Sequence, residues 1–280
     1  MKIATPNDIH GYKVIRSIGH GAGSDLFVVH DPVTHELFAL KRVVVRDQTS
    51  RRFLKQVERE HEVASMVTHP AIRRSHRIMR VREVIRTSEI SLLLRFVDGD
   101  PLDCRSSSDL PWLLEVFAGA SDGLAHLHGL GWAHADIKPG NILLGSEGNP
   151  VLIDLGQACP LGSCKDRIQG TPGFMAREQA ALGPIDARTD IFCLGASLYW
   201  MLAGRYGSCI MQDTGANADP APLHLENPQV SVELGRLVDA SISPDPSRRP
   251  GRADQFAAEL RGIAGRLRDQ GVDSPVLQPA

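Results

Sequence analysis

The sequence predicts an α+β protein in two parts, a smaller strand-rich part followed by a larger, mainly helical part. Residues 11–97 consist mostly of short runs rich in β-branched and aromatic residues, bounded by glycine, proline or aspartate. A stretch of strong helix formers interrupts these runs, and apolar residues recur at helical spacing after residue 98. We therefore expect a leader at 1–10, a first lobe at 11–97, a second lobe at 98–268 and a flexible tail at 269–280.

In the first part, three strands are expected at 12–18, 25–30 and 37–45, and the glycine-rich segment "GHGAGS" separates the first two. A helix is expected at 51–67, because apolar residues repeat there at helical spacing and the pattern stops before a proline. Two further strands, at 78–86 and 90–97, are expected to form a hairpin whose turn is "TSE" at 87–89.

In the second part, Asp109 is placed to cap a long apolar helix that has Pro111 in its first turn and ends at Gly129. Two short strands follow around the turn "GSEGN". An almost wholly apolar helix, expected from about Asp190 to Ala203, is typical of a buried one. The remaining expectations are a loop at 204–230 and helices at 231–241 and 252–268.

The composition is that of a water-soluble globular protein, with 42% hydrophobic and 23% charged residues among 280. A net charge of −2 gives no indication of nucleic-acid binding, and no apolar run is long enough to predict a membrane segment. Five scattered cysteines in a chain of this length favour a reducing compartment, the cytoplasm, over a disulfide framework. Cys159 and Cys164 lie close in sequence but lack a second ligand pair, which argues against a zinc site.

Two groups of polar residues indicate phosphate chemistry. "GHGAGS" is followed by Lys41 in a strand and by Glu60 in the next helix, an order that suits a clamp for nucleotide phosphates. The loop "HADIKPGN" holds Asp136 and Asn141, and Asp154 ends a strand thirteen residues later. Asp136 is a candidate proton acceptor, and the oxygens of Asn141 and Asp154 are suited to Mg²⁺. Taken singly, each feature is better explained by a surface turn or a solvated charge.

Together these motifs resemble those of the catalytic domain of eukaryotic-like (Hanks-type) serine/threonine protein kinases, over residues 11–268. The matching segments are "GHGAGS", "FALK", Glu60, "HADIKPGN", "DLG" at 154–156, "GTPGFMARE" at 170–178, "DIFCLG" at 190–195 and "DPSRRP" at 245–250. The resemblance implies a bilobal protein kinase fold, with a small antiparallel β N-lobe that includes helix C and a larger, mainly helical C-lobe. It also implies transfer of the γ-phosphoryl group of ATP to a serine or threonine hydroxyl of a protein substrate, with Mg²⁺ or Mn²⁺ as cofactor.

The resemblance assigns roles residue by residue. It makes Asp136 the base, places Lys138 at the γ-phosphate, and has the hydroxyl of Thr171 bridge these two side chains; Asn141 and Asp154 become metal ligands. The residues it assigns to ATP binding are Ile18, Gly19, Gly21, Gly23, Ser24, Leu26, Ala39, Lys41, Glu60, Leu94, Val97 and Leu143. Two expectations are structural: that His134 packs beneath the loop and bonds backbone, and that Glu178 pairs with Arg249 in the interior.

The sequence departs from the family pattern at several positions. Ser24 replaces the third loop glycine, Arg177 a proline, and Ala135 the arginine that normally receives a phosphorylated activation-segment residue. Activity without such phosphorylation is therefore expected. The arginines of "IRRSHRIMRVREVIR" are interpreted as a solvated sheet edge, with a patch for an acidic partner as the alternative.

Two other functions remain open at this stage. One is a catalytically silent pseudokinase that acts as a scaffold, although the lysine, base and metal ligands are all present. The other is a small-molecule phosphotransferase of related fold, which usually lacks a peptide platform of the "GTPGFMARE" type. The expected partners are ATP and a protein substrate, with autophosphorylation as a further reaction and with neither nucleic acid nor a membrane segment involved.

Overall fold

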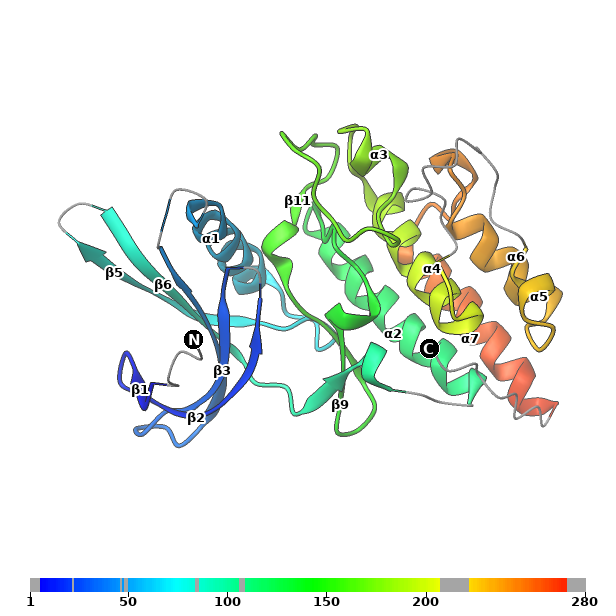
Figure 1. Ribbon diagram of the computed structural model, residues 1–280. Coiled ribbons are helices and arrows are strands. Elements are labelled where there is room, and N and C mark those ends of the chain that lie inside the picture. Colours follow the sequence, from blue (N-terminus) through cyan, green and yellow to red (C-terminus); the bar gives the residue numbers. More distant parts are fainter. Residues whose placement is uncertain are drawn as a thin grey trace. The chain divides into compact units, whose positions relative to one another are not determined.

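The computed structural model describes residues 6–21, 23–45, 47, 50–83, 86–105, 109–206 and 222–270. The chain divides into two compact units (Figure 1). The first unit comprises Met1–Thr68 and Ile72–Asp98, and the second comprises His69–Ala71 and the residues from Gly99 onward. Each unit is built around its own core and is described separately below.

The first unit contains an antiparallel sheet. Its strands are β1 (Asp8–Ile9), β2 (Tyr12–His20), β3 (Asp25–His30), β4 (Leu37–Val44), β5 (Ser75–Glu83) and β6 (Arg86–Arg95). They lie in the order β1-β2-β3-β4-β6-β5, so that β5 forms one edge. Part of the range expected as a leader thus pairs with the sheet, where Ile9 lies opposite Tyr12.

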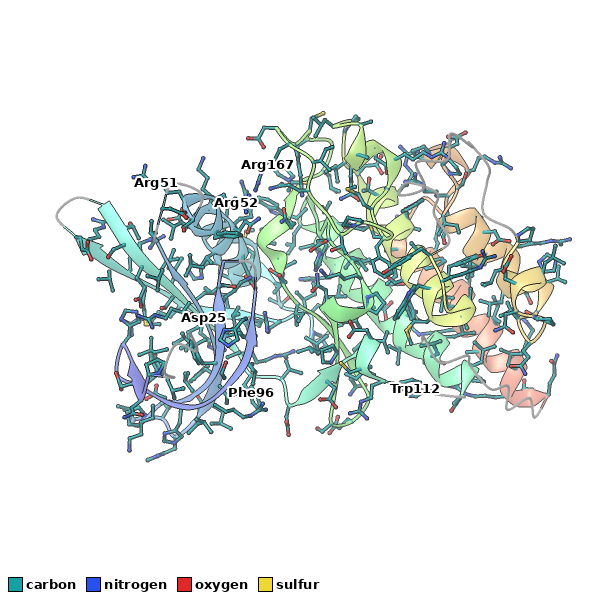
Figure 2. The ribbon with its side chains drawn as sticks, in the orientation of Figure 1. Asp25, Arg51, Arg52, Phe96, Trp112 and Arg167 are labelled. Atoms are coloured by element: carbon teal, nitrogen blue, oxygen red, sulfur yellow. The ribbon has the colours of Figure 1, made fainter. Side chains whose placement is uncertain are left out.

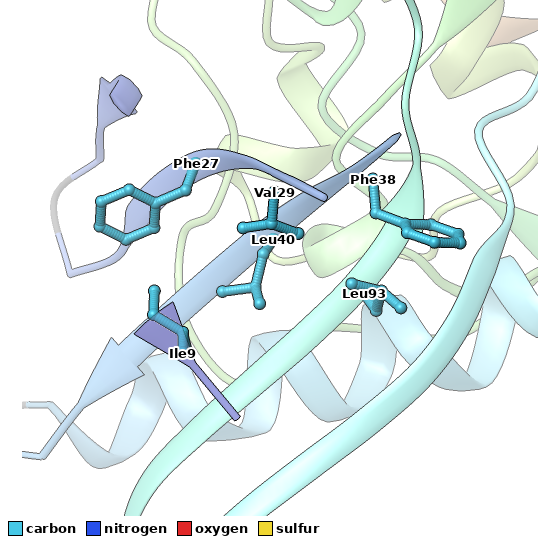
Figure 3. Packing of buried hydrophobic residues seen from close by; sticks show 6 residues of the cluster. All are labelled: Ile9, Phe27, Val29, Phe38, Leu40 and Leu93. Atoms are coloured by element: carbon cyan, nitrogen blue, oxygen red, sulfur yellow. The ribbon is translucent and has the colours of Figure 1, made fainter. Parts of the chain in front are cut away.

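Side chains alternate between the two faces of this sheet, as the pleat requires. Figure 3 shows one face, where Leu40 packs among Ile9, Phe27, Val29, Phe38 and Leu93. On the other face, Ala39 and Val43 join the buried cluster that includes Val57 of helix α1 (Arg51–Met66). Lys41 shares the parity of Ala39 and Val43 along β4 and is therefore directed to the same side as the helix.

The turn predicted at residues 87–89 is wrong, because these residues belong to β6. Glu89 pairs with Val81 of β5 and with Val44 of β4, so strand neighbours on both sides extend β6 past the expected turn. Glu89 also accepts a hydrogen bond from Arg42 of β4. A cross-strand ion pair of this kind favours continued pairing, and a local sequence pattern does not reveal it.

The second unit is mainly helical. Its longer helices are α2 (Leu110–Gly129), α4 (Ala187–Ala203), α6 (Val232–Ser241) and α7 (Ala253–Asp269). Asp109 caps α2 as predicted, because its side chain accepts a hydrogen bond from the backbone N–H of Trp112, which Figure 2 labels in the first turn. Helix α4 begins before the expected Asp190, because Asp186 caps it through the N–H of Arg188. Among the residues described, no helix has the length and apolar character needed to cross a membrane.

Two small groups of short strands also pair in the second unit. β9 (Ile142–Gly145) pairs with β10 (Pro150–Leu152) and with β7 (Gly99–Pro101), and β8 (Trp132–Ala133) pairs with β11 (Cys159–Pro160). The predicted loop at 204–230 contains helix α5 (Leu223–Glu226), so that prediction is wrong at its end. The interval 207–221, with Cys209, and the tail from 271 to 280 lie outside the described residues.

Candidate active site

In the first unit, Lys41 and Glu60 form a buried ion pair. Lys41 Nζ donates to Glu60 Oε2 at 2.7 Å, and the side chain of Glu60 is 2% exposed. β4 supplies the lysine and α1 the carboxylate, and the apolar packing of α1 on this face of the sheet brings the two charges together. Because Glu60 is buried and Lys41 is half-buried, their attraction is screened less than that of a surface pair, and it fixes the position of the ammonium group.

The glycine-rich segment forms a tight turn between β2 and β3. The N–H of Gly21 donates to the carbonyl oxygen of Ser24 at 2.7 Å, and His20 Nδ1 lies 2.7 Å from Asp25 Oδ1 across the base of the turn. Glycine is required at Gly23 by space, because a Cβ there would overlap the ring of Phe53 on α1. Ser24, which departs from the glycine pattern, accepts the hydrogen bond from Gly21 through its backbone carbonyl.

The strand register brings together several residues assigned to ATP binding. Gly19 pairs with Leu26, and Leu26 pairs with Lys41, so the three lie side by side across β2, β3 and β4. Ala39 pairs with Leu94 across β4 and β6, and both are buried. Of the remaining assigned residues in this unit, Val97 is half-buried and Ile18 is exposed.

In the second unit, a threonine hydroxyl connects the catalytic-loop lysine to the aspartate. Lys138 Nζ donates to Thr171 Oγ1 at 2.9 Å, and Thr171 Oγ1 donates to Asp136 Oδ1 at 2.9 Å. Lys138 Nζ lies 4.0 Å from Asp136 Oδ2. The hydroxyl uses its one proton and one lone pair in this chain, so the three side chains have a single mutually consistent arrangement.

Asn141 also contacts Asp136. Its Nδ2 donates to the carbonyl oxygen of Asp136 at 2.8 Å and to Asp136 Oδ2 at 3.4 Å, which leaves the amide oxygen out of both contacts. The backbone N–H of Ile153 donates to the backbone carbonyl oxygen of Asn141 at 3.0 Å. Asp154 is therefore the next residue after one that is hydrogen-bonded to Asn141. Leu143 is half-buried in β9, where it pairs with Val151.

The surroundings of Asp136 raise its proton affinity. Burial raises the pKa of its carboxyl above the ordinary value of 3.8, and the charge of Lys138 and the hydrogen bond from Thr171 oppose this rise. The proton affinity is therefore greater than that of an exposed aspartate, while the nearby cation keeps the carboxylate form accessible. A raised pKa increases the ability of the group to accept a proton from a hydroxyl.

Asp190 of α4 anchors the start of the loop "HADIKPGN" through hydrogen bonds to its backbone. It is fully buried, and its carboxylate accepts hydrogen bonds from the backbone N–H groups of His134 at 2.8 Å and Ala135 at 2.7 Å. Its Oδ2 also lies 2.9 Å from His128 Nε2. Burial tends to raise the pKa of Asp190, but the hydrogen bond and charge of His128 outweigh that effect and lower it. The carboxylate is thus kept ionised and accepts all three contacts. Sequence reasoning assigned no role to Asp190 or His128.

Two residues of the site have a left-handed backbone that is uncommon outside glycine. Ala135 has φ 60° and Asp154 has φ 64°. The conformation at Ala135 is held on both sides, since its N–H bonds Asp190 and its carbonyl accepts Gln179 Nε2 at 2.9 Å. Backbone strain of this kind persists where surrounding contacts over-determine it and is concentrated at functional sites. Gln179 is a further residue that sequence reasoning missed.

Two structural expectations are confirmed. His134 is fully buried, and its Nε2 lies 3.1 Å from the carbonyl oxygen of Ile153. Glu178 pairs with Arg249 through two hydrogen bonds, of 2.6 and 3.0 Å, and the side chain of Arg249 is 0% exposed. Burial tends to raise the pKa of Glu178, but the hydrogen bonds and charge of Arg249 lower it overall. This pair fastens the end of the segment that carries Thr171.

The donor chemistry fits Mg²⁺. Asp154 and Asn141 offer a carboxylate and an amide oxygen, which are the hard ligands that this ion prefers. Among the described residues, there is no group of three or more histidine, cysteine or acidic side chains arranged to hold a metal ion.

Comparison with known proteins places the chain in a family. The profile of the protein kinase domain matches residues 12–260. Serine/threonine-protein kinase 16 of Mus musculus is 30% identical over 272 residues, which cover 85% of this chain and 86% of that protein. Serine/threonine-protein kinase PknD of Chlamydia abortus is 25% identical, but the match spans 30% of its length against 89% of this chain.

A solved structure is similar in fold. The kinase domain of PknI from Mycobacterium tuberculosis, crystallised as a double mutant, superposes with a TM-score of 0.74 at 23% identity. The match covers 95% of this chain and all of the other. Together with the profile match over most of the sequence, these findings show that the chain belongs to the protein kinase family, as a serine/threonine protein kinase domain.

Proposed function

We propose that this domain is catalytically active and transfers the γ-phosphoryl group of Mg-ATP to serine or threonine hydroxyls of a protein substrate. The observation that carries the proposal is the hydrogen-bonded chain from Lys138 through Thr171 to Asp136. It holds a raised-pKa carboxylate beside an ammonium group, and so offers a proton acceptor and a phosphate-binding cation a few ångströms apart.

Residues of the first unit bind the nucleotide in this proposal. Lys41, oriented by Glu60, neutralises the α- and β-phosphates, and the backbone N–H groups of the glycine-rich turn approach the same phosphates. Ala39 and Leu94 present an apolar surface to the adenine, and Ile18, Leu26 and Val97 of the same unit are assigned to it as well. Leu143, the remaining residue of the assigned set, belongs to the second unit.

Residues of the second unit handle the transferred group. Asn141 and Asp154 hold the metal ion, which when bound offsets the negative charge that develops on the phosphate oxygens. Asp136 orients the acceptor hydroxyl and takes its proton, and Lys138 contacts the γ-phosphate. Most of the rate acceleration then comes from positioning and from charge neutralisation, since phosphoryl transfer needs little covalent assistance.

The preference for serine and threonine follows from reach. An aliphatic hydroxyl lies close to its own backbone, so the peptide has to approach the base closely, whereas a tyrosine oxygen lies several ångströms farther out. The bridge through Thr171 sets Asp136 close to the segment that contains this threonine, "GTPGFMARE" at 170–178. That peptide platform also favours a protein kinase over a small-molecule phosphotransferase, and the complete set of Lys41, Asp136, Asn141 and Asp154 favours it over a pseudokinase.

We expect the purified chain, incubated with [γ-³²P]ATP and Mg²⁺, to label a generic protein acceptor, itself, or both. The labelled residue should be phosphoserine or phosphothreonine by phosphoamino-acid analysis. Chelation of the metal with excess EDTA should abolish labelling, and added Mg²⁺ or Mn²⁺ should restore it. Predominant phosphotyrosine would contradict the specificity, and nucleotide binding without labelling of any protein would favour the scaffold function.

Replacement of Thr171 by alanine should lower the rate of transfer by about a hundredfold, because the hydroxyl that holds Asp136 and Lys138 together is removed. The matched control is Thr171→Ser, which keeps the hydroxyl and should retain most of the activity. Steady-state kinetics with a serine peptide measure both variants. If Thr171→Ala were as active as the parent, the bridge would have no catalytic importance.

We propose the cytoplasm as the place where this reaction occurs. The reaction requires ATP, and five scattered cysteines in a chain of this length favour a reducing compartment over a disulfide framework. The partners in this proposal are ATP and a protein that carries the serine or threonine acceptor.

A further inference from the structure

Arg73 makes a second contact with the carboxylate of Glu60. This arginine lies between Ile72 and the start of β5, and its side chain is 6% exposed. Arg73 Nη2 donates to Glu60 Oε1 at 3.4 Å, while Lys41 Nζ donates to the other oxygen, Oε2, at 2.7 Å. The expectation that the arginines of this segment form a solvated edge is therefore wrong for Arg73, although Arg74, Arg77 and Arg80 are exposed.

Lys41 and Arg73 can both bind Glu60 because they contact different oxygens of its carboxylate. A carboxylate that exchanged one partner for the other would show a single contact, whereas here both are made at once. The plane of the Glu60 carboxylate is thereby fixed from two sides, one by β4 and one by the segment before β5. Since Glu60 belongs to α1, the same contacts hold that helix against the sheet.

Burial of the Arg73 guanidinium is costly in free energy unless an opposite charge compensates it. Arg73 Nε has no hydrogen-bond partner among the described residues, and the guanidinium is almost wholly removed from water. A second cation is close by: burial, together with the charges of Arg73 and Arg74, lowers the pKa of Arg95. Glu60 is the carboxylate that Arg73 contacts, so it supplies the compensating charge.

We propose that Arg73 is a positioning residue that locks Glu60, and with it helix α1, in the orientation in which Lys41 is paired. This deepens the proposed function, on which its kinetic consequence rests. It also supplies a physical basis for activity without activation-segment phosphorylation, since Ala135 gives no cation to receive such a phosphate and Arg73 provides a permanent restraint within the first unit.

Amide hydrogen exchange on the full chain without nucleotide tests the restraint directly. In Arg73→Met, amides of α1 between residues 57 and 64 should exchange about tenfold faster or more, the size expected on loss of a charged hydrogen bond. The matched control is Arg80→Met, which removes an exposed pair between β5 and Glu58 of the same helix and should leave exchange within about twofold of the parent. Arg73→Lys keeps the charge and should restore most of the protection.

The double contact of Glu60 with Lys41 and Arg73 leads to a second prediction. In Lys41→Met, α1 should stay protected because Arg73 still holds Glu60, whereas Lys41→Met combined with Arg73→Met should lose protection by more than the two single effects together. In the kinase assay, Arg73→Met should lower kcat by about tenfold with little change in KM for ATP, and Arg73→Lys should recover it.

The outcomes separate the two proposals. Unchanged or slower exchange in α1 of Arg73→Met would overturn the locking role, because it would show that the contact between Arg73 and Glu60 does not restrain the helix. Faster exchange in α1 with unaltered kcat would also overturn it as a positioning role. If the parent chain transferred no phosphate at all, the proposed function would fail, while the exchange experiment would still decide whether Arg73 restrains the helix.

Discussion

Replacing Asp136 with asparagine is expected to lower the rate of phosphoryl transfer by about a thousandfold, the usual contribution of a positioned general base. Asparagine has the same shape and can still accept the hydrogen bond from Thr171, so the loop should keep its structure. What is lost is the ability to take the proton of the acceptor hydroxyl. Single-turnover kinetics at saturating ATP, with circular dichroism to verify folding, measure the effect.

The pH dependence gives an independent check. The parent should lose kcat/KM as the pH falls through the pKa of Asp136, which burial raises above 3.8, because the protonated carboxyl cannot act as a base. Asp136→Asn should lack this acid limb, while any limb that ATP itself contributes appears in both proteins. Asp254→Asn, which alters an exposed carboxylate in the first turn of α7, should behave like the parent. A parental profile shared by Asp136→Asn would exclude Asp136 as the base.

Replacing Glu178 with alanine is expected to lower the free energy of unfolding by about 3 kcal/mol or more, because it leaves a buried guanidinium without its counter-ion. Arg249 would retain hydrogen bonds to the carbonyls of Ser243 and Arg188, which satisfy some of its donors but do not neutralise its charge. Urea denaturation followed by circular dichroism measures the change at neutral pH.

The control for this prediction is Glu233→Ala, which removes a pair of similar length with Arg266 on the surface. Because both side chains of that pair are more than half exposed, the loss should stay below about 1 kcal/mol. The folded-state pKa of Glu178 is depressed, so its stabilising contribution is present above about pH 4.5, its ordinary value, and disappears as the pH falls through the folded pKa. Equal losses of unfolding free energy in the two variants would show that the buried pair stabilises the fold no more than the surface pair does.

Local sequence rules were sufficient for several parts of the fold. Asp109 could be recognised as a cap from its position before Pro111 and an apolar helix, because capping involves residues three apart. The helix at 51–66 likewise follows from its own apolar spacing. The turn expected at 87–89 failed because strand pairing of Glu89 with β4 and β5, which is not local, extended β6.

The same division holds for the site. Lys41, Asp136, Asn141 and Asp154 were predicted from residue type and order together with the resemblance to protein kinases, whose phosphate chemistry uses an ammonium, a carboxylate and hard oxygen ligands. Among the supporting residues, His134, Glu178 and Arg249 were expected, but Asp190 and Gln179 were not. Asp190 reaches back 55 residues to the N–H of Ala135, and Gln179 reaches back 44 to its carbonyl, so no spacing rule connects them.

By itself, the sequence determined the kinds of chemical group this protein possesses, their order along the chain, and the local elements that carry them. Tertiary structure alone decided which of several similar residues takes part. Arg73 stands in a run of arginines whose charge and type are the same, and the packing of α1 on the sheet left this one beside Glu60 while Arg74, Arg77 and Arg80 remained in water. The physical reason is that burial and charge pairing depend on the distance between side chains in space, which residue spacing specifies only within a single helix, strand or turn.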